Sequence, residues 1–540
     1  MKTRLLPAAL LLLALGVYAA ANAAWLRQNG LRCVGWPFHT RHFMKAAEIY
    51  NFIEHEEDIP DAVRMLSRDR FQPAPLHSLT AAALMHGVGK RIPLTTGLLN
   101  LLYFGAALLF IGLLAAELGG GTFETAWAML LYALYPAVYG LSRLYGAFDF
   151  QIAALVPAAV WCLLRTRRFE SRSYSLALGG IMALALLVKD TFAGYFGPVL
   201  AYAAHDALRG ARDHKRLAHL AAALGVTVLA TAVYYANGEI LYKELTEPLR
   251  ESAGQRYLLD DWQAYTVGLW RTLLSPPFLA LFLAALFWKA RRRPLDYGWK
   301  LLMIWVFAPW TILFFMKHFK QPSYFVPILP AAAILSAFAL RALGRGARLG
   351  VAAALFALGI VQFGAFSFDT GLRFPAWYHA PDPSIVYSRG FGSRSDLYRK
   401  IVSGVFDAVA RDGKNRILVL SEFRYQEFVT QYHLANWQSD VEFTIAGGVG
   451  EFFDRESLEE DYDRVLLPMG RDWDLRRYVS ELHAESLGLA RRNWLGATRK
   501  LEKTSPDEYR AWLERFLARF PKRERLGSDG DTDFWLYSKT

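Results

Sequence analysis

The sequence has few of the residues that build disulfide-bonded or zinc-binding domains. Only two of its 540 residues are cysteines, and neither Cys33 nor Cys162 belongs to a CxxC motif or to a cluster of cysteine and histidine. The sequence therefore offers no case for a disulfide framework or a structural zinc site. Charge is also scarce, since 20% of the residues are charged and 54% are hydrophobic, so a large part of the chain is built for lipid.

Positive charge is in excess, with a formal net charge of +12, which in other proteins accompanies nucleic-acid binding. Here the Lys and Arg residues cluster in short loops between apolar segments, as the cytoplasmic loops of membrane proteins do. The glycines of AGGVGEFF (446–453) follow a predicted strand but do not form a GxGxxG motif, which argues against nucleotide binding. We therefore expect no nucleic-acid partner.

The sequence contains many long apolar segments. The first, residues 1–24, has the basic flank of a cleavable signal peptide but is long enough to span a bilayer, so we favour a retained helix. Ten more follow, at about 94–117, 123–140, 148–164, 175–189, 191–208, 217–236, 265–288, 300–316, 323–341 and 348–367. Together they predict a polytopic membrane protein of about eleven transmembrane helices.

The basic loops predict the orientation of these helices. When spans are counted from a cytoplasmic N-terminus, every dense basic cluster between spans falls inside, namely those within 165–172, 209–216, 289–293 and 341–348. Four regions then fall outside: 25–93, the turn around 141–148, the loop 237–264 and everything after about 368. We therefore expect an extracytoplasmic functional face.

Two outer regions carry patterns of their own. In residues 25–93, KAAEIYNFIEH and DAVRMLSRDRF have apolar residues at helical spacing, which predicts amphipathic helices along the membrane surface. Residues 94–367 form the multi-span region. From 368 to 540 strand-like runs alternate with charged amphipathic helices, which predicts a soluble α/β domain. The strand-like runs are RILVLS (416–421), VEFTIAG (441–447), DRVLLP (463–468) and DFWLYS (533–538).

The order of these parts resembles the C-type (GT-C fold) membrane glycosyltransferases, in particular the dolichyl-phosphate-mannose protein mannosyltransferase and lipid A aminoarabinose transferase group. The resemblance covers about residues 1–345. A family Pro-Pro-Leu element is matched by Ala74-Pro75-Leu76, and an acidic residue at the end of a short outer turn by Asp149. A lysine at the outer end of the fifth span is similar to Lys189, and a basic turn followed by Tyr and two prolines is similar to KHFKQPSYFVPILP (317–330).

The sequence departs from the family where the resemblance places the catalytic base. The family has Asp-Glu there, followed at fixed spacing by an aromatic residue and Ala. Laid onto HTRHFMKAA, the aromatic residue is Phe43, the alanine is Ala47 and the aspartate position is His39. A neutral imidazole is able to accept a proton at neutral pH, so His39 is compatible with a base. The alternatives are an interfacial histidine bonded to its loop, or Glu48 as the base.

The resemblance implies a sugar transfer from a polyprenyl phosphate, which needs positive charge for the phosphate and contacts for the acceptor. Asp149 is a second catalytic candidate. An ionisable side chain at the end of a membrane span costs free energy unless it forms an ion pair or has a function. Its structural alternative is a salt bridge to Arg143. Asp149 is also the one clear oxygen ligand for a divalent cation such as Mg or Mn, so a metal is left open.

The remaining site candidates divide into two groups. The candidates for donor-phosphate binding are Arg41, Lys189, Arg256, Lys317 and Lys320, which the orientation places outside. The candidates for acceptor or substrate contact are Glu48, Arg143, Tyr145 and Tyr324. Lys189 has an alternative interpretation, in which it forms a local ion pair with Asp190. Tyr324 also has one, in which it is an aromatic residue of the membrane interface.

The leading hypothesis is thus an integral membrane glycosyltransferase of the bacterial inner membrane, with its C-terminal domain in the periplasm. Its partners would be a polyprenyl-phosphate-linked sugar, a glycan, lipid or protein acceptor, and the lipid bilayer. The alternative is a catalytically lapsed relative that binds a lipid-linked sugar as a scaffold in envelope assembly. A secondary transporter is disfavoured, because neither an inverted repeat nor a matching pair of broken helices is present.

Overall fold

The computed structural model describes two compact units, one built of helices and one that contains a β-sheet. The described residues are 2–29, 46, 49–50, 75–89, 92–209, 214–235, 273–291, 295–315, 322–368, 416–420, 442–446, 462–470, 514–529 and 532–539, with isolated residues in 370–378, 401–411 and at 511. Cys33 lies outside them, whereas Cys162 is a buried free thiol.

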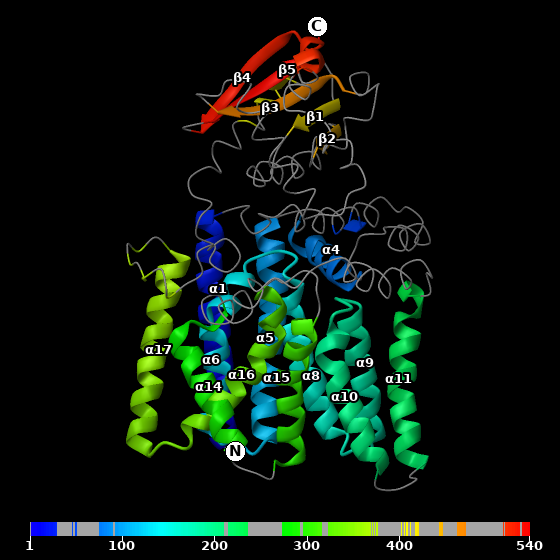
Figure 1. Cartoon of the computed structure of the whole chain (residues 1–540), viewed down its shortest axis with the longest axis vertical. Coiled ribbons are helices and arrows are strands. Elements are labelled where there is room, and N and C mark those ends of the chain that lie inside the picture. The colour runs from blue at the N-terminus through cyan, green and yellow to red at the C-terminus, as the bar shows by residue number, and fades with distance from the viewer. Residues whose placement is uncertain are drawn as a thin grey trace. The chain divides into compact units, whose positions relative to one another are not determined.

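The helical unit is a bundle whose longer helices run side by side (Figure 1). Its elements are α1 (Lys2–Asn29), α4 (Leu76–Val88), α5 (Ile92–Glu117), α6 (Thr122–Leu134), α7 (Pro136–Leu141), α8 (Phe148–Arg165), α9 (Arg172–Leu186), α10 (Phe192–Arg209), α11 (His214–Tyr235), α14 (Pro276–Arg291), α15 (Tyr297–Phe315), the 3₁₀ helix η3 (Pro322–Ile328), α16 (Leu329–Leu340) and α17 (Arg345–Ser367). Helical structure therefore occupies at least part of every predicted span.

Four helical stretches of the described residues are long and apolar enough to cross a membrane: Leu94–Glu117, Phe148–Arg165, Ser323–Leu340 and Arg345–Ser367. Leu12–Arg27 and Arg172–Leu186 are apolar but shorter. The predicted polytopic helical fold is thus confirmed, whereas the number of eleven spans stays a prediction. Within the amphipathic segment predicted before them, Ala46 and Ile49 are helical and buried, as the spacing of KAAEIY predicts.

One predicted span, 123–140, consists of two helices. The chain leaves α6 at Tyr135, whose backbone is extended (φ −68°, ψ 130°), and re-enters a helix at Pro136. Proline disfavours the helical conformation in the residue before it and is well placed at the first position of a new helix. The sequence run PAVYGL therefore starts a short helix of its own before the outer turn that leads to α8.

The core of the bundle is closely packed and mostly apolar. Side chains along α16 are almost all buried, and this helix packs on α6 and α14, while α5 packs on α8 and α6. At the edge of the bundle α9 lies against α11, where a Cβ atom added to Gly179 would come 2.4 Å from the carbonyl oxygen of Ala223. The Thr227 hydroxyl donates to the carbonyl oxygen of Gly179 across this contact (3.1 Å). Glycine is thus what lets the two backbones approach.

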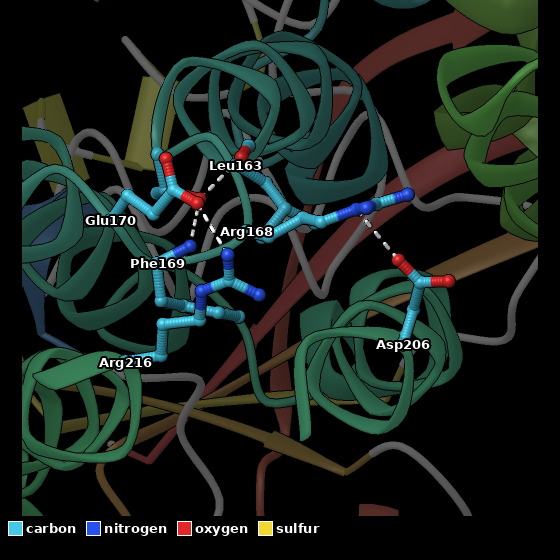
Figure 2. A network of polar contacts seen from close by, with 7 residues as sticks. Leu163, Arg168, Phe169, Glu170, Asp206 and Arg216 are labelled. Carbon is cyan, nitrogen blue, oxygen red and sulfur yellow. Dashed lines mark hydrogen bonds and ion pairs between the residues drawn. The ribbon is translucent and has the colours of Figure 1, made fainter. Parts of the chain in front are cut away.

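A charged network holds the turn between α8 and α9, at the predicted inner end of the bundle (Figure 2). Arg168 forms an ion pair with Asp206 of α10 (2.9 Å), and Glu170 forms one with Arg216 of α11. The turn itself has three consecutive residues with positive φ, namely Arg167 (52°), Arg168 (60°) and Phe169 (64°). Such a backbone is costly for residues with a Cβ atom, so the network holds a strained turn in place.

The second unit contains a mixed five-stranded sheet of β1 (Arg416–Leu420), β2 (Glu442–Ala446), β3 (Arg464–Gly470), β4 (Lys522–Asp529) and β5 (Thr532–Ser538). The strand order is β2-β1-β3-β5-β4; β1 pairs in parallel with β2 and β3, and β5 pairs antiparallel with β3 and β4. The four predicted strands are confirmed. Strand β4 was not predicted, and the domain boundary at 368 stays a prediction.

Candidate functional site

Asp149 and Lys189, which lie far apart in the sequence, meet at the predicted outer end of the bundle. Asp149 belongs to the first turn of α8, and Lys189 to the turn between α9 and α10. The Lys189 Nζ atom lies 2.7 Å from Asp149 Oδ1, and the two side chains are only 17% and 11% exposed. This pair differs from the two ion pairs considered in the sequence analysis. Asp149 pairs with Lys189 and not with Arg143, and Lys189 pairs with Asp149 and not with Asp190.

Tyr324 completes this pair from a third part of the chain. It lies in η3, and the Lys189 ammonium nitrogen is 4.8 Å from the centre of its ring. A cation over an aromatic face is attracted by the electron-rich ring. The Tyr195 hydroxyl of α10 donates to the carbonyl oxygen of Tyr324 (2.5 Å), which fixes the position of η3. Three segments that the resemblance identified separately therefore converge on one charged centre.

The Lys189 ammonium group is nearly buried and, among the described residues, donates one hydrogen bond, to Asp149 Oδ1. The neighbouring carboxylate favours the charged form of the amine. An ammonium group has three N–H donors, so Lys189 retains capacity for an incoming anion.

A second polar pair, His77 and Gln151, lies beside the charged centre. The Leu76 amide donates to the carbonyl oxygen of Leu187 (2.9 Å), which brings the start of α4 to the end of α9, two residues before Lys189. His77 Nδ1 lies 2.5 Å from Gln151 Nε2, with the rings of Tyr145 and Phe148 4.6 and 4.8 Å away. Both side chains of the pair are buried. We call His77, Gln151 and the side chains around them the polar layer. Tyr145, a predicted contact residue, belongs to it.

The sequence analysis missed His77 and Gln151, although each carries a signal. Gln151 is an amide within an otherwise apolar helix, FDFQIAAL, and a polar group inside a span is costly unless it is bonded or functional. His77 directly follows the Ala-Pro-Leu element that the resemblance identified. Asn100 of α5 extends the layer, since its Nδ2 donates to the carbonyl oxygen of Leu144 (3.0 Å).

Arg143 lies in a different environment from Asp149. Its Nε donates to Asn22 Oδ1 of α1 (3.0 Å), and its guanidinium lies over the rings of Trp25 (5.3 Å) and Phe363 (5.2 Å). The side chain is almost fully buried. Arg143 thus ties α1 and α17 to the outer turn, and its predicted contact with an acceptor stays a prediction.

The other candidates lie outside the described residues; they are His39, Arg41, Glu48, Arg256, Lys317 and Lys320. In the part of the chain that the structure describes, no three His, Cys, Asp or Glu side chains gather to form a metal cage. Asp149 offers oxygen ligands, but one of its oxygens is bonded to the Lys189 ammonium. The predicted cation therefore stays open, and no chemical step below is assigned to it.

Among solved structures the chain is similar to ArnT from Cupriavidus metallidurans. The ArnT structure bound to undecaprenyl phosphate has a TM-score of 0.58 at 15% sequence identity and covers 97% of both chains. The apo structure of ArnT has a TM-score of 0.57 at 13% identity over 97% of both chains. No family model and no curated protein matches the sequence. At such identities the likeness establishes the fold, and it confirms the predicted GT-C architecture of a multi-pass membrane protein.

Proposed function

We propose that this protein is an integral membrane glycosyltransferase that transfers a sugar from a polyprenyl-phosphate donor to an acceptor on the extracytoplasmic face. The observation that carries the proposal is the buried Lys189–Asp149 pair at the predicted outer end of the bundle. The solved structure of ArnT with undecaprenyl phosphate supports this donor class, since it shows a lipid phosphate bound by a protein of the same fold. The proposed location is a bacterial inner membrane, with the C-terminal unit in the periplasm.

Lys189 would act on the leaving group. When the bond between the anomeric carbon and the phosphate oxygen breaks, the bonding electrons stay on that oxygen as negative charge. A fixed cation in a water-poor site stabilises such charge strongly, because it is already oriented and needs no rearrangement. Asp149 positions the ammonium group by its hydrogen bond, while the Tyr324 ring covers one side of it. Arg41, Arg256, Lys317 and Lys320 are proposed as further phosphate contacts.

The neutral polar layer beside this pair suits the hydroxyl groups of a sugar. Gln151 Oε1 and Asn100 Oδ1 are buried and have no hydrogen-bond partner among the described residues. A buried amide oxygen without a partner costs about 1–3 kcal/mol, so a donor supplied by a ligand would be favourable there. The aromatic rings around His77 supply apolar surface for the face of a sugar ring.

His39 is the proposed base toward the acceptor. It would take the proton from the acceptor hydroxyl or amine while that group forms the new bond to the anomeric carbon. The alternative function, a lapsed enzyme that holds a lipid-linked sugar as a scaffold, is favoured by one observation, namely that histidine stands where the family has aspartate. The acceptor, whether glycan, lipid or protein, is the second substrate in either case.

The test is turnover of polyprenyl-phosphate sugars by the purified protein in lipid nanodiscs, followed by mass spectrometry. We expect Lys189→Met to lower turnover by about 100-fold or more, Lys189→Arg to retain part of it, and Lys300→Met, at an exposed position on α15, to leave it unchanged. His39→Ala should abolish turnover while donor binding persists. Donor binding by the wild type without turnover of any donor and acceptor pair would favour the scaffold instead.

A further inference from the structure

An apolar cleft of about 410 Å³ lies between α1 and α5. Among the described residues its walls are mostly alanine and leucine, with three side chains of α1 that carry polar groups, Tyr18, Asn22 and Arg27. Its volume falls in the range of sites that bind small ligands. Nothing in the proposed glycosyl transfer uses this cleft.

The cleft exists because α1 touches α5 at only a few places. The Tyr18 ring is stacked on Phe104 of α5, with ring centres 3.8 Å apart. Nearer the end of α1, Leu26 approaches Gly97, where an added Cβ atom would lie 3.1 Å from the leucine Cδ1. The cleft lies between these contacts, where α1 contributes the small side chains of Ala19 and Ala23.

The length of the cleft corresponds to one leaflet of a membrane. On α1 it extends from Tyr18 to Arg27, which is about 13 Å at the rise of an α-helix. Half of a bilayer hydrocarbon core is about 15 Å. The predicted orientation, with the N-terminus inside, makes this the outer leaflet and puts Arg27 at its surface.

Arg27 supplies the charge at the mouth of the cleft. Its side chain is exposed and has no ion-pair or hydrogen-bond partner in the part of the chain that the structure describes. A guanidinium group matches a phosphate in charge and in the geometry of its donors. We infer that the cleft binds an anionic phospholipid of the outer leaflet, with one acyl chain between α1 and α5 and the phosphate on Arg27.

A phospholipid fits the cleft better than the lipid of the proposed donor does. An acyl chain spans one leaflet, as the cleft does, whereas an undecaprenyl chain is far longer than one leaflet. A second copy of this chain would have to place a whole helix there, which is wider than the single acyl chain that a cleft of about 410 Å³ accommodates. The test below distinguishes the phospholipid from the donor lipid and from a second copy of the chain.

The test uses native mass spectrometry of the full chain released from detergent, with phosphatidylglycerol, phosphatidylcholine or undecaprenyl phosphate added. We expect one molecule of phosphatidylglycerol to be retained in preference to the other two lipids. Ala23→Phe, which fills the cleft, should abolish this retention. Ala24→Phe is the matched control, because Ala24 is the next residue on α1, is exposed and does not line the cleft.

A second variant addresses the charge without changing the shape. Arg27→Gln should lower the preference for phosphatidylglycerol over phosphatidylcholine by about fivefold, whereas Arg172→Gln, at an exposed arginine of the opposite end, should not. Equal retention by the Ala23→Phe and Ala24→Phe variants would overturn the inference, as would a preference that survives Arg27→Gln. Retention of undecaprenyl phosphate or of a second protein copy in place of the phospholipid would also overturn it.

Discussion

The two ends of the helical bundle hold ion pairs of similar composition in different surroundings. At the predicted outer end both side chains of the Lys189–Asp149 pair are less than one fifth exposed, whereas at the inner end one side chain of each pair, Arg168 or Glu170, is about half exposed (50% and 51%). A buried pair costs desolvation free energy that an exposed pair does not, so it persists only where structure or function depends on it. We infer that the inner network stabilises the turn between α8 and α9, while the outer pair is part of the proposed donor-binding site.

The largest effect should come from breaking the outer pair. Lys189→Met leaves the Asp149 carboxylate buried and unpaired, and we expect a loss of about 3–5 kcal/mol in the free energy of unfolding. The measurement is unfolding of the reconstituted protein in mixed micelles with increasing SDS. The double variant Asp149→Asn/Lys189→Met should regain most of the loss. If Lys189→Met lowers the free energy of unfolding no more than Glu170→Gln in the inner network does, the two ends of the bundle do not differ in this way.

The next effect concerns α9, the helix that joins the strained inner turn to the segment carrying Lys189. Gly179→Ala would drive a methyl group into the backbone of α11, and we expect it to cost about 1–3 kcal/mol in the same assay. Gly180→Ala is the control, because a Cβ atom there meets nothing within 4 Å, and it should be neutral or stabilise the helix slightly. Equal losses in the two variants would argue against close packing of α9 on α11.

A smaller effect should follow when an inner ion pair is removed. Glu170→Gln takes the charge from the contact with Arg216, and because Glu170 is half exposed we expect a loss of at most about 1 kcal/mol. The loss should shrink further at 1 M salt, where charges are screened over about 3 Å. A salt-independent loss of several kcal/mol would show that the inner network behaves like the outer pair.

The smallest effect should be a gain at the strained turn. Arg167 has a φ of 52° and an exposed side chain, so Arg167→Gly relieves backbone strain at some cost in chain entropy. We expect the free energy of unfolding to rise by up to about 1 kcal/mol, as SDS unfolding would measure. Arg167→Ala removes the same charge but keeps the Cβ atom, so it should give no gain.

The sequence predicts the helices well, because long apolar runs have few alternatives to a membrane span. The resemblance singles out Asp149 and Lys189, but nothing in local sequence indicates that they pair with each other, since that contact depends on how α8 and α9 pack. His77 and Gln151 were missed because their pairing joins α4 to α8 across the fold. Strand β4 was missed because KRERLGSD lacks the alternation of apolar and polar residues that marks a strand.

The strand order places β4 at one edge of the described sheet, where β5 is the strand that pairs with it. An edge strand presents backbone N–H and C=O groups that another chain is able to bind. Charged side chains discourage such pairing, and β4 begins with four of them, Lys522, Arg523, Glu524 and Arg525, all exposed. The composition that hid β4 from prediction thus protects this edge against association with other chains.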